Sequence, residues 1–377
     1  MASKRFCFFN GTDRHHDELL IYHQANSLMN DGFEVLFIVS DNESEEIRQG
    51  VRLVPNGAKH EGYLKRIFVT PFLTYRKAKE INADVYQTSS VDQLIVGYWL
   101  KRKGKKVIFH QREGHPYTFK RKSKLPKWLT NVLINLMVVW MKSILKRYDS
   151  VITVTDDIAD YMQKWGLKNV VVQGNYPVIN PNYEITFDDY CSRENRILYF
   201  GSIYSISCQE YLLDAMLKVE GIHYLLAGRF WGNKDYYEQL KKHSNWKDVE
   251  FIDGFEHEEL ASFFNKSTIC NVLRDFSNTP SPNGSLGIIK MFESMEAALP
   301  IICSDVPVYR KLMEEYKCGI LVDPKNSDQI AEAINYLITH KEEAYRMGQE
   351  GRRAVVEKYS WDALSKEYLR IVNGLLK

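Results

Sequence analysis

The feature that most constrains the fold is an alternation of short apolar runs with amphipathic stretches of helical length. The chain opens with KRFCFFN, continues through the helical stretch DELLIYHQANSLMNDG, and then reaches FEVLFIV. Continuous apolar runs of this length are typical of parallel strands buried on both faces, and parallel strands need crossover helices between them. The sequence therefore predicts an α/β chain built on doubly wound parallel sheets.

The alternation begins a second time at 196–200, RILYF, which Gly201 follows directly. It continues through HYLLAG, VEFIDG, STICNVL, LPIICSD and GILVDP. A chain of 377 residues exceeds what one hydrophobic core usually serves. Residues 178–195 carry proline and asparagine turn signals without a helical period. We therefore predict Rossmann-like domains at 1–180 and 196–358, a linker at 181–195, and a last helix at 359–377.

Charge is distributed unevenly along the chain. Residues 1–180 hold 27 Lys+Arg and 18 Asp+Glu, a net of +9, whereas the remainder holds 23 and 30, a net of −7, and the two sum to the overall +2. A basic first half favours an anionic partner surface, such as membrane phosphate or a lipid diphosphate. The alternative is a solvated charged face together with attraction between the two halves.

The cysteines and the short motifs indicate the cellular compartment of the protein and whether it depends on a metal ion. The six cysteines show no metal-ligand spacing, and most lie in apolar stretches such as TICNV, so we expect reduced core residues of a cytoplasmic protein. KRFCFFN is too short for a signal peptide, and VLINLMVVWM at 132–141 is too short to span a bilayer. No DxD-like motif stands in a plausible loop, so we expect no metal dependence.

The stretch 284–300, GSLGIIKMFESMEAALP, combines a buried type of helix with charged residues. The segment NGSLG would stand at the helix N-terminus, where free N–H groups and the helix dipole favour an anion. This predicts a diphosphate at the helix start, with Lys290 supplying charge and Glu293 accepting sugar hydroxyls. The alternative is a surface helix with one Lys–Glu pair. A helix that starts at 286 is expected to have two different faces. The apolar face would carry Ile288, Phe292, Met295 and Leu299. The opposite face, with the charges, would carry Leu286, Lys290, Glu293, Ser294 and Ala297.

The same region resembles the donor-binding region of retaining glycosyltransferases of the glycosyltransferase family 4 type, which have the GT-B architecture. The matching motifs are K-x-F-E-x-M, L-P-I-I-x-S-D and C-G-I-L-V-D-P. RILYFGSI, YLLAGRF, VEFIDGFEHEELASFFN and YSWDALSKEYLRIV are similar to further family segments, so the resemblance covers nearly the whole chain. It implies two Rossmann-like domains facing across a cleft, an N-terminal acceptor domain and a C-terminal nucleotide-sugar domain, with the last helix crossing back to the first domain.

On the donor side, the resemblance implies that Glu293 binds the nucleotide ribose as the second glutamate of an E-x7-E motif. The first glutamate falls on Ser285, so the motif is broken and the sugar contact must come from backbone or from neighbours such as Asn283. Lys290 is expected to neutralise the diphosphate. Backbone N–H groups of Leu286, Gly287 and Ile288 are expected to face the phosphates.

Further donor contacts are expected from the loops that follow the strands. After Gly201, the positions where many members carry Arg and Lys are Ser202 and Ser207. A metal-free site must supply cations to the leaving diphosphate, so Arg229 and Arg274 are the expected substitutes. The remaining expected contacts are backbone contacts to the base, from Gly254 and Phe255.

On the acceptor side, the resemblance places Gly11 where the first loop approaches the sugar and phosphate. Asp17 matches an acidic residue of that loop and is expected to be catalytic, together with Lys290 and Arg229, and His16 lies beside it. In HQREGHP, Glu113 is kept and His115 follows, and both are expected to line the acceptor side.

A long basic helix is expected at 120–147, KRKSKLPKWLTNVLINLMVVWMKSILKR. Leu129, Val132, Leu133, Leu136 and Trp140 would share one face. A helix of this kind favours peripheral association with the cytoplasmic face of the inner membrane. The alternative is a Rossmann helix packed on its sheet.

Together these features imply a retaining glycosyltransferase of the hexosyltransferase type, EC 2.4, that uses a nucleotide diphosphate sugar, with UDP as the expected nucleotide. The implied acceptor is a saccharide or lipid-linked saccharide in surface polysaccharide biosynthesis, with no further cofactor and no nucleic-acid partner. A GT-B protein that binds a nucleotide sugar without transfer, and a UDP-sugar epimerase, remain alternatives. A dinucleotide oxidoreductase is disfavoured, because FFNGTDRH has one glycine where G-x-G-x-x-G would stand.

Overall fold

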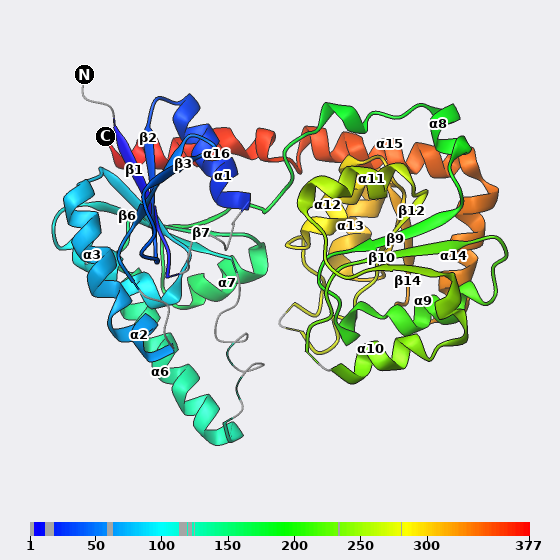
Figure 1. Ribbon diagram of the computed structural model, residues 1–377, viewed down its shortest axis with the longest axis horizontal. Coiled ribbons are helices and arrows are strands. Elements are labelled where there is room, and N and C mark those ends of the chain that lie inside the picture. The colour runs from blue at the N-terminus through cyan, green and yellow to red at the C-terminus, as the bar shows by residue number, and fades with distance from the viewer. Residues whose placement is uncertain are drawn as a thin grey trace. The chain divides into compact units, whose positions relative to one another are not determined.

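The computed structural model describes residues 4–11, 19–58, 63–112, 119, 123, 125–232, 234–279 and 281–377. The chain forms two compact units (Figure 1). Unit 1 comprises Met1–Asn175 and Leu364–Lys377, and unit 2 comprises Tyr176–Ala363. Each unit has a sheet covered by helices on both faces, so the predicted α/β class with two doubly wound domains is confirmed.

Unit 1 is built on an eight-stranded sheet in the order β3-β4-β2-β1-β5-β6-β7-β8. All its neighbouring strands are parallel except β3 and β4. The strands are β1 (Arg5–Phe9), β2 (Glu34–Val39), β3 (Glu46–Arg48), β4 (Val51–Pro55), β5 (Val85–Thr88), β6 (Lys106–Gln111), β7 (Ser150–Thr153) and β8 (Val170–Val172). The helices are α1 (Leu19–Asn30), α2 (Tyr63–Phe68), α3 (Thr70–Ile81), α4 (Leu94–Lys101), α6 (Lys127–Leu145) and α7 (Asp156–Lys164), with a 3₁₀ turn η1 (Val91–Gln93).

The last helix, α16 (Trp361–Leu375), is tied to unit 1 by a buried polar network. The Tyr368 hydroxyl donates to Gln87 Oε1 at 3.0 Å, and Gln87 Nε2 donates to Gln24 Oε1 at 2.7 Å. Gln24 Nε2 lies 3.3 Å from His110 Nδ1. Burial holds the pKa of His110 well below its usual value. Buried polar groups need such partners, so the network fixes the position of the helix on this unit.

Unit 2 is built on a six-stranded sheet, entirely parallel, in the order β11-β10-β9-β12-β13-β14. Its strands are β9 (Arg196–Phe200), β10 (His223–Ala227), β11 (Val249–Ile252), β12 (Ile269–Val272), β13 (Ile301–Ser304) and β14 (Gly319–Val322). Its helices are α8 (Phe187–Ser192), α9 (Gln209–Met216), α10 (Lys234–Lys241), α11 (Leu260–Asn265), α12 (Ile289–Glu296), α13 (Pro307–Tyr316), α14 (Ser327–Thr339) and α15 (Lys341–Glu357). Short 3₁₀ turns are η2 (Pro181–Tyr183), η3 (Ser205–Ser207), η4 (Ser244–Asp248) and η5 (His257–Glu259).

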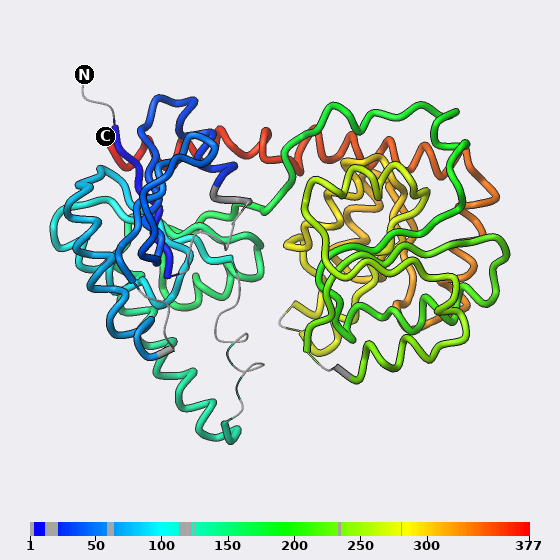
Figure 2. The backbone as a smooth tube through the Cα atoms, in the orientation of Figure 1, coloured from blue at the N-terminus to red at the C-terminus, as the bar shows by residue number. Residues whose placement is uncertain are grey.

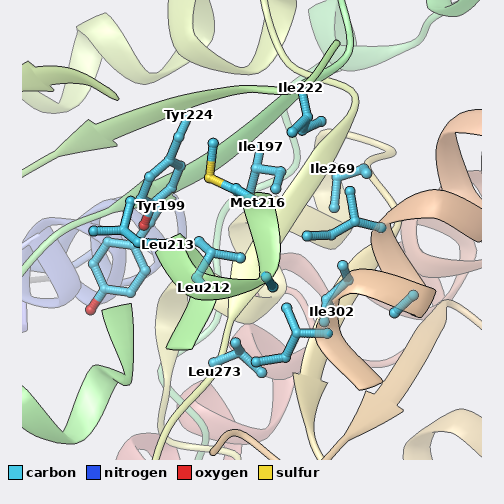
Figure 3. Close-up of a cluster of buried hydrophobic side chains, with 14 of the residues drawn as sticks. Ile197, Tyr199, Leu212, Leu213, Met216, Ile222, Tyr224, Ile269, Leu273 and Ile302 are labelled. Carbon is cyan, nitrogen blue, oxygen red and sulfur yellow. The ribbon is translucent and has the colours of Figure 1, made fainter. Parts of the chain in front are cut away.

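The core of unit 2 lies between the sheet and the helices α9 and α14. Figure 3 shows part of this core, where side chains from β9, β10, β12 and β13 meet Leu212, Leu213 and Met216 of α9. Most of the strand residues in this cluster are β-branched or aromatic, as expected for a pleated, buried surface. All six cysteines of the chain are free thiols, and five of them are buried, as the apolar context of most of them predicted.

The stretch 181–195 differs from the expected linker. It contains η2 and α8, and Thr186 caps α8 by accepting a hydrogen bond from the Asp189 N–H at 3.1 Å. Tyr190 is 2 % exposed and its hydroxyl donates to the Thr268 carbonyl at 3.0 Å. The stretch is therefore an integral part of unit 2. A six-residue helix is too short to show a 3.6-residue period, which explains why the sequence pattern missed it.

Three aromatic rings pack where the chain enters and leaves unit 2. The ring centroid of Phe292 lies 4.6 Å from that of Tyr176 and 5.0 Å from that of Tyr359, and the two tyrosine rings lie 5.4 Å apart. Phe292 is fully buried on α12. The cluster thus anchors both ends of this unit to one helix.

We predict that Phe292→Ala lowers the free energy of unfolding of unit 2 by about 3–5 kcal/mol, because a buried ring is lost and a cavity remains. Hydrogen exchange measured by mass spectrometry on peptides from β12 and β13 reports this unit separately. The matched control is Leu217→Ala, also in unit 2, at a side chain that is 57 % exposed, for which the change is below about 0.5 kcal/mol. Equal effects of the two substitutions would contradict the role of the cluster.

Candidate functional site

The strand order of unit 2 defines where a ligand site is expected. From β9 the chain adds β10 and β11 on one side, and it then returns to place β12, β13 and β14 on the other side. In open parallel sheets, ligands bind at the carboxyl ends of the strands where the order reverses. In unit 2 that point lies after Phe200 of β9 and Val272 of β12.

Glycines allow the loops at this edge to approach one another closely. The Gly201 N–H donates to the Ala227 carbonyl at 2.9 Å, and the Ile203 N–H donates to the Arg229 carbonyl at 2.9 Å. Gly228 has φ +150°, and a Cβ there would lie 1.8 Å from the Gly201 carbonyl oxygen. No side chain fits at that distance, so the turns after β9 and β10 meet backbone to backbone.

Arg229, predicted from the sequence, follows β10, and its side chain lies against the turn after β11. A Cβ at Gly254 would lie 2.8 Å from Arg229 Nε, and Gly254 has φ +80°, so a glycine is needed there on two grounds. The Arg229 side chain is exposed, and within the described part of the chain it forms no ion pair. Phe255 packs its ring 5.6 Å from Phe263 of α11. The structure therefore brings Arg229 and Gly254 together, with the Arg229 guanidinium group lying against the turn that contains Gly254.

Lys290 reaches the loop after β9 from the first turn of α12. Its Nζ lies 3.7 Å from the ring centroid of Tyr199, and 3.7 Å from where a Cβ on Gly201 would stand. The Tyr199 hydroxyl in turn donates to the Ser202 carbonyl at 2.8 Å. Cation–π contact of this kind orients an ammonium group without neutralising it. The structure thus brings the predicted Lys290, Gly201 and Ser202 together at the point where the strand order reverses.

Glu293 is paired with a histidine that the sequence analysis did not identify. His257 Nε2 lies 2.9 Å from Glu293 Oε1, and the Glu293 side chain is 9 % exposed whereas that of His257 is 56 % exposed. The hydrogen bond to the carboxylate raises the pKa of His257 above its usual value. His257 stands in the short turn η5 that follows β11, and its separation of 36 positions from Glu293 gives no local signal of the pairing.

The segment before α12 is a fixed loop rather than the start of the helix. Ser285 Oγ accepts from the Gly287 N–H at 3.1 Å, and the Ser285 carbonyl accepts from the Tyr309 hydroxyl at 3.1 Å. The Asn283 carbonyl accepts from the Val308 N–H at 3.0 Å. Leu286, Gly287 and Ile288 are half-buried and precede the helix, which begins at Ile289.

Two details of the expected helix are therefore wrong. The helix starts three residues later than 286, because Ser285 and Gly287 form a turn instead. The face expected to carry the charges is not exposed to solvent either, since every residue from Met291 to Glu296 is buried. Ser294 turns its hydroxyl to the Lys290 carbonyl at 2.6 Å, which satisfies a buried donor within the helix. The N-cap residue Ile288 has no side chain that can accept a hydrogen bond, so it caps none of the N–H groups in the first turn of α12.

Arg274 follows β12 at the same edge of the sheet. Its N–H donates to Ser304 Oγ at 2.8 Å, and the Ser304 hydroxyl donates back to the Arg274 carbonyl at 2.8 Å. Its guanidinium carbon lies 5.7 Å from the ring centroid of Phe276. The backbone of Arg274 is thus held by β13, while the guanidinium rests against an aromatic ring.

Glu296, the third charged residue of α12, has a structural role. Its carboxylate accepts from the Asn180 N–H, and burial raises its pKa to about 7. Arg352 of α15 donates to the Glu296 carbonyl at 2.6 Å and to the Asn180 carbonyl at 3.2 Å. Glu296 and Arg352 therefore hold the entering chain against α12.

In unit 1, the strand order reverses between β1 and β5. Gly11 follows β1, and a Cβ there would lie 2.0 Å from Asp92 Oδ2. Asp92 accepts from two nitrogens of Arg66, each at 3.2 Å, so a carboxylate missed by the sequence analysis lies against Gly11. The predicted acceptor-side residues His16, Asp17, Glu113 and His115 lie outside the described residues. Within the described residues, no group of three or more His, Cys, Asp or Glu side chains is arranged to hold a metal ion.

Comparison with known proteins identifies the fold. Sucrose-phosphate synthase from Thermosynechococcus elongatus aligns over 99 % of both chains with a TM-score of 0.74 and 16 % identity. Anabaena HepE, in complex with UDP and glucose, aligns over 98 % of this chain and 100 % of its own with a TM-score of 0.73 and 14 % identity. These matches, with two doubly wound units, define a protein of the GT-B fold.

Sequence comparison gives the family. A family model described as Glycosyltransferase Family 4 matches residues 18–175, and one described as Glycosyl transferases group 1 matches residues 191–354. An uncharacterised glycosyltransferase of Methanocaldococcus jannaschii is 28 % identical over 182 residues, which are 47 % of this chain and 44 % of that protein. The match thus spans less than half the length of that relative. The chain belongs to the family 4 type of glycosyltransferases.

We predict that Glu296→Gln changes the pH dependence of stability. The folded-state pKa of about 7 lies above the usual 4.5, so the folded protein binds this proton more tightly and stability falls as pH rises from about 4.5 to about 7. Glutamine keeps the acceptor oxygen and cannot ionise, so the variant gains up to about 3 kcal/mol relative to the wild type across this range. Urea denaturation at pH 5 and pH 7.5 measures this, and a difference independent of pH would contradict it.

We also predict that the pKa of His257 depends on Glu293. The pKa is raised by the hydrogen bond to that carboxylate, so the pairing is fully present below the ordinary histidine pKa of about 6.5 and is lost as pH rises through the raised value. Imidazole NMR titration of Glu293→Gln gives a pKa lower than in the wild type. Glu332→Gln, at an exposed carboxylate on α14, leaves the His257 titration unchanged. A His257 pKa insensitive to Glu293→Gln would refute the pairing.

Proposed function

We propose that this protein transfers a sugar from a nucleotide diphosphate sugar to a saccharide or lipid-linked saccharide acceptor, with retention of anomeric configuration. The observation that carries the proposal is the pair Lys290 and Glu293, three positions apart on α12 where the strand order of unit 2 reverses. One offers a cation held by an aromatic ring, and the other offers a buried carboxylate oriented by His257. A diphosphate and a ribose require these two functions in adjacent positions.

In this proposal, Glu293 accepts hydrogen bonds from the ribose hydroxyls, and Lys290 and Arg229 stabilise the diphosphate as its charge develops. Both cations are free of ion pairs within the described residues, so their charge is available to a ligand. Backbone N–H groups of Leu286, Ile288 and the first turn of α12 supply further donors. Asn283 stands beside Ser285, where the family glutamate is replaced, and we assign it to the donor sugar.

The proposed chemical step needs no strong base from this chain. The bond between the anomeric carbon and the leaving phosphate oxygen breaks, and the acceptor oxygen bonds to the same face of the sugar. The acceptor proton passes to the leaving phosphate oxygen. Asp17, in the first loop of unit 1, is assigned to the acceptor side of this step together with His16, Glu113 and His115.

We propose UDP as the nucleotide, a cytoplasmic location, and a role in surface polysaccharide assembly. The family assignment and the similarity to Anabaena HepE, which was crystallised with UDP and glucose, support the nucleotide. We further propose that transfer needs no metal ion, because Lys290, Arg229 and Arg274 provide the cations that a diphosphate requires.

We predict that UDP binds in the presence of EDTA, and that Lys290→Ala and Glu293→Ala each weaken binding by more than tenfold, or about 1.4 kcal/mol. Each variant removes one of the two contacts assigned above. Isothermal titration calorimetry with UDP and with GDP measures the affinity and the choice of nucleotide. The matched control is Lys311→Ala, at an exposed lysine on α13, which binds as the wild type does.

Transfer is tested separately with a panel of UDP-sugars and radiolabelled acceptor extracts. If Lys290→Ala and Glu293→Ala both bound UDP with wild-type affinity, the assignment of the nucleotide site to these residues would be wrong. Binding without transfer to any acceptor would favour the nucleotide-sugar-binding alternative that the replaced Ser285 and Ser202 positions suggest. A change of the donor sugar without any acceptor would favour an epimerase.

A further inference from the structure

The helix α6 of unit 1 exposes an apolar face over most of its length. Figure 2 shows it extending beyond the sheet at the end where it begins. Its last turns are buried in the core through Met141, Ile144 and Leu145, and Met137, Val138 and Trp140 are partly buried against it. The exposed apolar side chains follow the helical repeat on one face: Trp128 at 69 %, Val132 at 47 %, Leu136 at 62 % and Val139 at 66 %.

This stripe differs in part from the face expected from the sequence. Val132 and Leu136 are exposed as that face requires, whereas Leu129, Leu133 and Trp140 are half-buried. By length and composition alone α6 could cross a bilayer. Its C-terminal turns belong to the hydrophobic core of unit 1, however, and inserting the helix across a bilayer would require their removal. The geometry therefore favours a helix that lies on a surface.

A second exposed apolar group lies on α2 and α3. Its members are Leu64 at 70 %, Phe68 at 65 %, Val69 at 48 % and Phe72 at 63 % exposed. Apolar side chains of this size gathered on consecutive helices are unusual on a monomeric protein and mark an interaction surface.

The helix α4 joins these two groups. It packs against α3 on one side and against α6 on the other. Trp99 of α4 lies with its ring centroid 5.1 Å from Phe72 and 5.3 Å from Tyr75 of α3, and the Arg147 guanidinium lies 5.6 Å from the Tyr98 ring. The exposed groups of α2, α3 and α6 thus belong to one layer of helices.

A cavity of about 380 Å³ lies in this layer. It is lined by three aromatic side chains and two cations: Phe72, Tyr75, Trp99, Arg102 and Lys103. Aromatic walls with a basic rim suit a group that is apolar at one end and anionic at the other.

The charge around the layer is positive. Among the described residues, α6 and the turn that follows it carry four cations, Lys127, Lys142, Lys146 and Arg147, and no aspartate or glutamate before Asp149. Acidic groups near the layer are already paired: Asp92 with Arg66, Glu80 with Lys77, and Asp149 with Lys101. A basic surface of this kind repels a second copy of itself, and it attracts an anionic bilayer.

We propose that the layer formed by α2, α3, α4 and α6 docks on an anionic phospholipid membrane. The exposed apolar side chains enter the boundary between headgroups and acyl chains. Arg102 and Lys103 take a lipid phosphate at the rim of the aromatic cavity. This proposal does not depend on the proposed transfer reaction.

The test is co-sedimentation of the full chain with vesicles of phosphatidylglycerol and phosphatidylcholine. The wild type binds mixed vesicles at least tenfold more tightly than pure phosphatidylcholine vesicles, and added salt weakens the binding. The double variant Leu136→Glu/Val139→Glu, at exposed positions, loses at least tenfold in affinity. Arg102→Glu/Lys103→Glu lowers the affinity for mixed vesicles toward that for phosphatidylcholine. The matched control is Ile47→Glu on β3, which is 74 % exposed and retains wild-type binding.

Circular dichroism and thermal unfolding of the same variants check that they remain folded, and UDP titration reports the site of unit 2 separately, so failure here is distinguishable from failure of the nucleotide site. Absence of wild-type binding to mixed vesicles would overturn the proposal. Wild-type binding by both double variants would also overturn it, because another surface would then be responsible. A wild-type dimer in light scattering that Leu136→Glu/Val139→Glu converts to monomer, without vesicle binding, would make the layer an interface between copies and overturn the proposal.

Discussion

The constraint on which the site depends is that one short helix carries two buried carboxylates, Glu293 and Glu296, and the half-buried Lys290. A buried charge without a partner is costly, so each of the three needs its own compensation. Lys290 rests on the Tyr199 ring, Glu293 is paired with His257, and Glu296 holds the Asn180 N–H under the Arg352 guanidinium. These partners come from β9, η5, the entry of the chain into unit 2, and α15. The helix is thereby fixed to four separate parts of the unit, and its first turn has little freedom at the edge where the strand order reverses.

Much of this fold could be predicted from sequence because parallel strands buried on both faces give unmistakable apolar runs. RILYF and LPIICSD become β9 and β13 of one parallel sheet for that reason. The same physics explains the error in α12. A helix buried all round has no polar face, so a period of 3.6 residues cannot say which small residue, such as Ser294, faces the core. The late start of the helix depends on a turn made by Ser285 and Gly287, which a helical pattern does not register.

The partners of the site residues could not be predicted because they depend on which strand ends are adjacent. His257 and Glu293 meet only because the turn after β11 and the helix after β12 both lie at the carboxyl edge of the sheet. Asp92 meets Gly11 only because β1 and β5 are neighbours in unit 1. A single sequence gives the residue types but not the strand order. The charged residues could therefore be selected from the sequence, whereas the residues they pair with could not. Lys290 and Glu293 were identifiable because both belong to one contiguous motif.

The way the cations are held also bears on what the site can bind. A lysine or arginine paired with a carboxylate must give up that pair, or share it, before it can stabilise an anion. Lys290 is held by a ring and Arg229 by a glycine turn, so each is oriented without an ion pair to any of the described residues. Cation–π contact at a partly exposed site contributes about 0.5–2 kcal/mol, which is enough to position the ammonium group and too little to compete with a charge-assisted hydrogen bond to phosphate. In the proposed donor site, where Ser202 and Ser207 stand at positions expected to be basic, aromatic and glycine supports of this kind would keep the charge of Lys290 and Arg229 available to a diphosphate.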